Sequence, residues 1–322
     1  MRGPQLPRRG LFALVAAGAA GLVASPATAA PRVTVVQVGG ELSAIAVNPV
    51  TGLVYAADST AGSISVLDPT AGKVVAVLTV GGAPSGLAVD TTANRIYAAN
   101  PPGGTVLAID GATHRTLSVI NAGAGASAVA VDPDAQLAYA VSNSAGTFAI
   151  LDTVSLTQRT LLPAPKPGLA GVAVDTGRRR AYCTSPDTDS VEICDLGAGK
   201  FTGSVAVGAG PTGIAVHQQS GTVFVANSGI HHLSIVDGVN GTEVKTVLLG
   251  SEASSVAVHQ GTETVYTNGG QNGLSRVDGQ AGTLSGELGL GINPGEVAVD
   301  EQTRAVYVTD PLHGTVTIVR DF

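Results

Sequence analysis

Short apolar runs separated by turn-forming residues recur along the chain from about residue 33 to its end. The first run of each unit ends in Ala-Val, and its Ala recurs in steps of 41 to 43 residues, at Ala46, Ala88, Ala130, Ala173, Ala215, Ala257 and Ala298. About ten residues later a second run begins at Tyr55, Tyr97, Tyr139, Tyr182, Phe224, Tyr266 and Tyr307. A third run, such as Ile64–Asp68, and a looser fourth, such as Val74–Val80, complete the unit. Runs of four to seven β-branched or alternating apolar residues between turn formers predict strands rather than helices.

Four strands every 42 or so residues predict the blade of a β-propeller. The chain contains seven first, second and third runs but only six fourth runs. The segment Val33–Val38 supplies the missing strand, which we expect beside Val316–Val319 as the outer strand of the last blade. The predicted fold is therefore an all-β, seven-bladed propeller with four antiparallel strands per blade, in which an N-terminal strand closes the ring.

The aromatic residues follow the same repeat. All six Tyr, together with Phe224, occupy one repeat position, so we expect one structural aromatic side chain per blade, packed between blades. No aromatic platform is left for stacking sugars or bases. The first strand of each unit favours Gly and Ala, as at Gly86, Gly171 and Gly213, which indicates crowding near the propeller axis.

This organisation resembles the YVTN-repeat family of β-propellers, and Tyr307-Val308-Thr309-Asp310 is the closest copy of its tetrapeptide. The resemblance covers about residues 33–322 and implies an exported or surface-associated propeller without specifying a function. The Trp and Gly-His residues that mark WD40 repeats are absent, although the blade plan is WD40-like.

Residues 1–30 resemble an export signal. A basic start precedes the apolar run Leu11–Ala24, and Ala27-Thr28-Ala29 fits a cleavage site, so we expect cleavage near Ala29 or Ala30 and an extracytoplasmic location. Arg8-Arg9 resembles a twin-arginine signal but lacks the preceding Ser or Thr, and an ordinary Sec signal is the alternative. The apolar run is short for a membrane span, and we expect no transmembrane segment in the mature chain.

Composition and charge exclude several classes of protein. The chain is 44% hydrophobic and 13% charged, which argues against disorder and against a coiled coil. Its net charge is −7, and removal of residues 1–30, which hold three Arg and no acid, leaves −10. A nucleic-acid partner is therefore not expected. The run Arg178–Arg180 is short enough to be a solvated turn.

The strand directions place the loops that join fourth to first strands, and second to third strands, on one face, which we call the top face. Ligands of such folds bind on loops around the central channel. Carboxylates and imidazoles on this face could bind a divalent cation, and an acidic rim is the alternative. The candidate metal ligands are Glu41, Glu252, Glu296, Asp310 and His313, with Asp58, His231 and His232 on neighbouring loops. Glu296 stands where the other copies have Gly, Ala or Ser, so we expect it near the channel mouth.

On the opposite, bottom face, His217 and His259 replace the Asp or Asn that ends the first strand in other copies. Such short polar residues set turns through bonds to the backbone. We expect a turn role for both His, and a shared metal ion is the alternative.

Cys183 and Cys194 lie on the second and third strands of one unit, and a turn centred near Thr188-Asp189 would let them face each other. They could form a disulfide in an exported protein or remain buried thiols. The Gly208–Gly213 segment matches a dinucleotide-binding fingerprint, but it links two strands and no helix follows.

We assign no catalytic or cofactor-binding residue and predict no cofactor. The expected function is a monomeric, non-enzymatic scaffold that binds an unknown protein or small ligand on its top-face loops. The alternatives are a metal-assisted, lactonase-like hydrolase or lyase with a top-face site, and a structural component of the cell surface.

Overall fold

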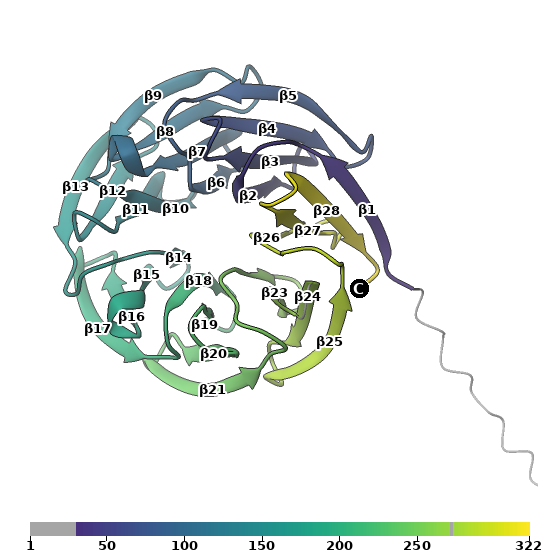
Figure 1. Ribbon diagram of the computed structural model, residues 1–322. Helices are drawn as coiled ribbons and strands as arrows, with labels where there is room; N and C mark the ends of the chain where they lie inside the picture. The colour runs from purple at the N-terminus through teal and green to yellow at the C-terminus, as the bar shows by residue number, and fades with distance from the viewer. Residues whose placement is uncertain (1–29, 271–272) are drawn as a thin grey trace, which may run out of the picture. The chain divides into compact units, whose positions relative to one another are not determined.

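The computed structural model describes residues 30–270 and 273–322. Residues 31–322 form one compact unit, shown as a ring of sheets in Figure 1. The predicted export signal lies, apart from Ala30, outside the described residues. Within the described part of the chain, no helix has the length and apolar character needed to cross a membrane.

The propeller prediction is confirmed, because the strands form seven sheets of four antiparallel strands each. Six blades follow the chain in order from inner to outer strand. Blade 1 holds β2 to β5, blade 2 holds β6 to β9, and so on to blade 6, which holds β22 to β25. The strands of the first three blades are Leu42–Asn48 (β2), Leu53–Asp58 (β3), Ser63–Asp68 (β4), Lys73–Thr79 (β5), Gly86–Asp90 (β6), Arg95–Asn100 (β7), Thr105–Asp110 (β8), Thr116–Asn121 (β9), Ala126–Asp132 (β10), Leu137–Ser142 (β11), Thr147–Asp152 (β12) and Thr157–Pro163 (β13).

Blades 4 to 6 repeat this plan, and short 3₁₀ turns interrupt the second-to-third loops of blades 2 and 4, at Pro101–Gly103 (η1) and Pro186–Thr188 (η2). Their strands are Val172–Asp175 (β14), Arg180–Ser185 (β15), Ser190–Asp195 (β16), Lys200–Ala206 (β17), Pro211–Val216 (β18), Thr222–Asn227 (β19), His232–Asp237 (β20), Thr242–Leu248 (β21), Val256–His259 (β22), Thr264–Gly270 (β23), Gly273–Asp278 (β24) and Thr283–Gly289 (β25).

Blade 7 is assembled from both ends of the described chain. Its inner three strands are Val297–Val299 (β26), Val306–Asp310 (β27) and Thr315–Arg320 (β28), and its outer strand is Arg32–Gln37 (β1). β1 pairs antiparallel with β28 in a register that runs from Arg32 opposite Arg320 to Gln37 opposite Thr315. Figure 1 shows β1 lying along the outside of β28. The predicted closure by the N-terminal strand is thus confirmed.

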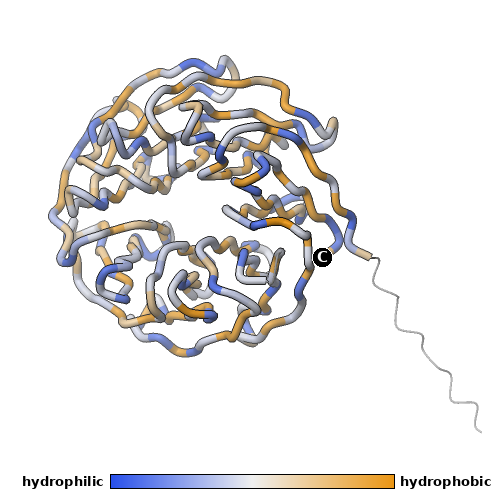
Figure 2. Tube along the Cα trace, viewed as in Figure 1, coloured by the Kyte–Doolittle hydropathy of each residue, from blue (hydrophilic) through white to orange (hydrophobic). Residues whose placement is uncertain are grey.

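The hydrophobic core is divided into seven clusters, and each cluster joins one blade to the next. Each cluster contains one aromatic residue of the repeated position, and all seven aromatic side chains are buried: Tyr55, Tyr97, Tyr139, Tyr182, Phe224, Tyr266 and Tyr307. Figure 2 shows that apolar positions recur all round the ring. The predicted structural role of the aromatic residues between blades is confirmed. Because every seam contributes part of the core, no blade has a complete core by itself.

The inner strands approach one another closely around the axis. A Cβ on Gly86 would lie 2.8 Å from the carbonyl oxygen of Ser127, and one on Gly213 would lie 2.6 Å from that of Ser254, both in the next blade. Separations this short are not tolerated without movement of the backbone. The Gly preference of the first strands therefore has the predicted cause.

The bottom-face turns after the first strands also form as expected. Asn48, Asp90 and Asp300 are buried, and their side-chain oxygens accept hydrogen bonds from backbone N–H groups two and three residues further on. These short polar side chains satisfy the backbone of the turn.

Candidate functional site

The top end of the central channel contains a cavity of about 270 Å³. All seven inner strands or the residues just before them contribute to its walls, so the cavity exists only in the closed ring. One repeat position supplies small residues in six blades and Glu296 in blade 7: Ala44, Gly86, Ala128, Gly171, Gly213, Ser255 and Glu296. The next position supplies apolar side chains deeper in the channel: Ile45, Leu87, Val129, Val172, Ile214, Val256 and Val297.

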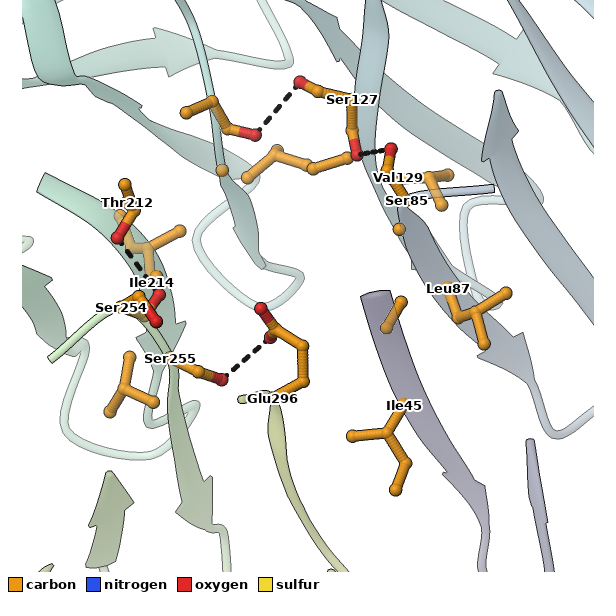
Figure 3. Close-up of a pocket in the computed structure, with 18 of the residues that line it drawn as sticks. Ile45, Ser85, Leu87, Ser127, Val129, Thr212, Ile214, Ser254, Ser255 and Glu296 are labelled. Carbon is orange, nitrogen blue, oxygen red and sulfur yellow. Dashed lines mark hydrogen bonds between the residues drawn. The ribbon is translucent and has the colours of Figure 1, made fainter. Parts of the chain in front are cut away.

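Hydroxyl groups at the rim of this cavity link neighbouring blades. Ser85 Oγ donates a hydrogen bond to the carbonyl oxygen of Ser127 at 2.8 Å, and Ser127 Oγ donates to that of Ala170 at 3.1 Å. Thr212 Oγ1 donates to the carbonyl oxygen of Ser254 at 3.0 Å. These bonds are drawn in Figure 3. Each hydroxyl proton therefore points at the next blade, and the hydroxyl oxygens retain their acceptor lone pairs.

Among the described residues that line this cavity, Glu296 has the single ionisable side chain. Its Oε2 accepts a hydrogen bond of 2.9 Å from Ser255 Oγ in blade 6, and Ser255 Oγ in turn accepts from the backbone N–H of Val297. Figure 3 shows the Glu296 side chain extending between the inner strands toward Ser255. Desolvation raises the pKa of Glu296 to about 7, although the hydrogen bond from Ser255 opposes the shift. The structure therefore places this predicted site residue in the channel mouth.

The other two glutamates lie on separate top-face loops. Glu41 is exposed and accepts a hydrogen bond from Thr60 Oγ1 at 3.1 Å. Glu252 is also exposed, and its Oε1 lies 3.5 Å from His231 Nε2. Neither residue lines the central cavity.

Asp310 and His313 form a local pair in blade 7. The buried Asp310 accepts hydrogen bonds through Oδ1 from the backbone N–H groups of Leu312 and His313, and its Oδ2 lies 2.7 Å from His313 Nδ1. Asp58 holds the matching loop of blade 1 in the same way, through the N–H groups of Thr60 and Ala61. Both aspartates therefore have a turn-forming role that the sequence pattern did not reveal.

The candidate metal ligands are thus spread over separate contacts. Residues 30–270 and 273–322 contain no group of three or more His, Cys, Asp or Glu side chains arranged to hold a metal ion. A divalent cation on the top face stays the alternative that the sequence left open beside the prediction of no cofactor.

The bottom-face histidines act in turns, as expected. His217 Nδ1 lies 2.8 Å from Ser220 Oγ, and His259 Nδ1 lies 3.0 Å from Thr262 Oγ1, so each imidazole replaces the turn-forming carboxylate. Their Nε2 atoms contact the next blade, at the carbonyl oxygens of Gln260 and Glu301 respectively.

A ladder of side-chain amides connects the same blades, and sequence reasoning missed it. Gln218 accepts a hydrogen bond from the backbone N–H of Thr176 and donates to the carbonyl oxygen of Val174. Gln260 repeats both bonds one blade later, and the Glu301 carboxylate accepts from the N–H of Gln260. The signal was a polar residue directly after the turn-forming one, at positions 176, 218, 260 and 301.

The cysteines are buried free thiols. The strand register pairs Cys183 with Glu192 and Cys194 with Ala181, so the cysteines are diagonal neighbours rather than directly opposite. The expected turn centre was one residue too late, because the hairpin turns through η2 and a left-handed Asp189. Burial raises the pKa of the Cys194 thiol to about 12.

The arginine run supports the seam between blades 4 and 5. Arg178 Nη1 contacts Asp175 at 3.0 Å and donates to the carbonyl oxygen of Gln218, and Arg180 donates to that of Val239. The run is thus more structural than the solvated turn expected from the sequence.

The top-face loops are acidic and nearly free of lysine and arginine. The top-face loops expose the carboxylates of Glu41, Asp187, Asp189 and Glu252. Among the described residues of the top-face loops, Lys166 is the single lysine or arginine. Its Nζ lies 3.6 Å from the buried carboxylate of Glu192. The bottom face carries the Arg178–Arg180 run and Arg304 together with exposed carboxylates, such as Asp134, Asp278 and Glu301. A ligand approaching from the top therefore meets an acidic surface.

Comparison with solved structures finds propellers. This chain is similar to a chain of the Kuenenia stuttgartiensis hydrazine synthase structure. The TM-score is 0.77 and the identity 15%, over 88% of this chain and 96% of that chain. It is similar to U3-55K, with a TM-score of 0.79 and 10% identity over 89% and 98% of the two chains. The WD40 repeats of RRP9 give a TM-score of 0.80 and 11% identity over 89% and 97%. No family model and no curated protein matches the chain. At these identities the likeness shows the propeller fold alone.

Proposed function

We propose that this protein is an exported, non-enzymatic binding scaffold of the YVTN-repeat type, which takes its ligand or partner on the top face over the central channel. The observation that carries the proposal is the cavity at the top end of the channel, to which all seven blades contribute. Sites of this kind, concave and built on a rigid frame with few polar groups, are where ligands bind.

The rigid frame and the variable loops support a scaffold. The positions that hold the ring together, such as the buried aromatic residues, repeat in every blade, whereas the charged residues at the top differ from blade to blade. Loops that vary on a constant frame can be adapted to a partner without loss of the fold.

A matched pair of surface cysteines tests the face used. Leu312 on the top face and Val154 on the bottom face are exposed loop residues, at 74% and 63% of their maximal areas. We would make Leu312→Cys and Val154→Cys, label each with a thiol-linked benzophenone, and irradiate each in the cells that produce the protein. The buried Cys183 and Cys194 provide an unlabelled background.

The expected result is a discrete cross-linked species from the Leu312→Cys protein and none from the Val154→Cys protein. Cross-linking from the bottom face alone, or turnover of a lactone by the purified protein, would contradict the proposal. Cell fractionation tests export, since a chain retained with cytoplasmic markers would contradict that part.

A further inference from the structure

We infer that the top end of the central channel binds a primary ammonium group carried on an extended chain, with Glu296 as its counter-ion and the rim oxygens as further acceptors. The inference rests on the proposed top-face scaffold and names the chemistry of its ligand. It follows from three observations: the direction of the hydroxyl donors, the position of the carboxylate and the charge of the surrounding loops.

The rim of the cavity is rich in acceptors and poor in free donors. Of the five hydroxyl side chains in the lining, four already donate to a protein oxygen: Ser85, Ser127, Thr212 and Ser255. The backbone oxygens that receive three of these bonds have two lone pairs each. An ammonium group has three donors and no acceptor, so it complements this rim, whereas an anion would find few donors.

The carboxylate supplies the opposite charge at the same place. Glu296 Oε2 is bonded to Ser255, and among the described residues no hydrogen-bond donor reaches its Oε1. Charge-assisted hydrogen bonds between ammonium and carboxylate are about twice as strong as neutral ones. Because no lysine or arginine lines this cavity, a cation must come from the ligand.

The size and surroundings of the cavity agree with this ligand. Its volume of about 270 Å³ is that of about nine molecules of liquid water, enough for an ammonium group and a short alkyl stem. The apolar side chains deeper in the channel, including Ile45, Leu87 and Ile214, offer contacts to methylene groups. The acidic top-face loops would attract a cation toward the opening.

Two sources present this chemistry, a lysine side chain of a partner polypeptide and a free alkyl diamine. We would titrate the purified protein by calorimetry with the peptide acetyl-Gly-Lys-Gly-amide and, separately, with 1,5-diaminopentane. One-to-one binding of either probe is expected. Binding of the peptide alone identifies a lysine side chain as the source, and binding of the diamine alone identifies a free amine.

Methylation of the ammonium tests the acceptor rim without altering the protein. The trimethyl-lysine form of the peptide keeps the charge but has no N–H donor, so its affinity should be at least about tenfold lower. Equal affinity for the two peptides would overturn the inference, because it would indicate attraction to charge without hydrogen bonds.

A pair of charge-removing variants tests the counter-ion. Glu296→Gln keeps the shape and the acceptor for Ser255, and it should weaken binding of the ammonium probe by at least about tenfold. Glu252→Gln removes the same charge from an exposed top-face position outside the cavity and should leave the affinity within about twofold. Thermal melts of both variants report whether they fold.

The inference would be overturned if neither probe binds, if Glu296→Gln binds as well as the original protein, or if Ca²⁺ alone binds at Glu296 while both amines fail. Failure of amine binding together with a Leu312 cross-link would remove this inference and leave the proposed scaffold standing. Failure of both experiments would remove the proposed function as well.

Discussion

Blade 2 and blade 7 share one fold but are built differently. Blade 2 is one continuous stretch of chain from β6 to β9, whereas blade 7 receives its outer strand from the N-terminal side of the ring. At the channel, blade 2 presents Ser85 and Gly86, and blade 7 presents Gly295 and Glu296. The repeat is therefore kept where packing between blades requires it and is altered where side chains meet the channel.

The shared positions show what the fold requires. Tyr97 and Tyr307 are both buried in a seam, and Asp90 and Asp300 both form the bottom-face turn. At the channel the two blades differ, since the hydroxyl of Ser85 bonds the next blade and Gly295 has no side chain that could do so. Blade 7 is therefore the blade built from two separate stretches of chain, and it is also the blade that places a carboxylate in the channel.

The largest expected effect comes from removing the strand that distinguishes blade 7. Deletion of residues 31–37 exposes the edge of β28 and removes the pairing of six residues. We expect a loss of about 5 kcal/mol or more in the free energy of unfolding, at about 1 kcal/mol per hydrogen bond plus burial of Val36. Thermal and denaturant unfolding measure it.

Two single substitutions in β1 act as controls for this deletion. Val36 is 3% exposed and Val35 is 58% exposed. Val36→Ala should cost about 1.5 kcal/mol from lost burial, and Val35→Ala should cost little. An unchanged melting temperature on deletion of β1 would show that the ring does not depend on this closure.

The next largest effect is the pH dependence of the free energy of unfolding that Glu296 in blade 7 causes. Because the pKa of Glu296 is raised from 4.5 to about 7 in the folded protein, its neutral form is favoured by folding. The associated stability is fully present below pH 4.5 and is lost as the pH rises through about 7. Glu296→Gln should match the original protein at low pH and exceed it by up to about 3 kcal/mol above pH 8.

Melting curves from pH 4 to pH 9 measure this difference. The Glu252→Gln protein is the control, because it removes an exposed carboxylate outside the channel cavity and leaves the contact between Glu296 and Ser255 in place. If the stability gap for Glu296→Gln does not widen between pH 5 and pH 8, the channel carboxylate is not desolvated.

The next prediction concerns substitutions at the repeat position that holds Gly86 in blade 2 and Glu296 in blade 7. Gly86→Ala brings a Cβ within 2.8 Å of the Ser127 carbonyl oxygen and 2.9 Å of the Ala128 Cα, both backbone atoms. We expect a loss of about 1–3 kcal/mol. Glu296→Ala at the matching position of blade 7 should cost less, because a side chain already fits there. Chemical denaturation ranks the two variants, and a reversed order would contradict the crowding argument.

The smallest effect concerns the bottom-face ladder, which ends in blade 7. Gln218 and Gln260 each donate to a carbonyl oxygen of the preceding blade, at 2.9 and 3.0 Å, and an ionised Glu301 cannot. Burial raises the pKa of Glu301, so its penalty grows as the pH rises. Glu301→Gln should therefore stabilise the protein by about 1 kcal/mol at neutral pH, measured by thermal unfolding. A destabilised variant would show that the charge contributes more than the missing donor.

The sequence could predict which residues lie at the candidate site, but it could not predict how their side chains are arranged. Aligning the repeats places Glu296 at the channel, since equivalent positions of a closed ring lie at equal depth. The same alignment put Glu41, Glu252 and Asp310 on the top face, but it could not show that Asp310 is occupied by two backbone N–H groups. Side-chain direction within a loop depends on local hydrogen bonds that the repeat pattern does not encode.

By itself, the sequence determined the number of blades, the strand order, the closing strand and the buried aromatic position, because each is a periodic property that every copy must satisfy. Only the tertiary structure decided which polar groups meet. It revealed the serine hydroxyls that donate across blades, the Gln218–Gln260 ladder, the diagonal placement of Cys183 and Cys194, and the buried Glu192 beside Lys166. The hydroxyl bonds and the ladder join residues one repeat apart, and they are set by how one blade packs on the next, which no single repeat contains. The placement of the cysteines depends on a one-residue shift in a turn, and Lys166 reaches Glu192 from the loop that precedes β14.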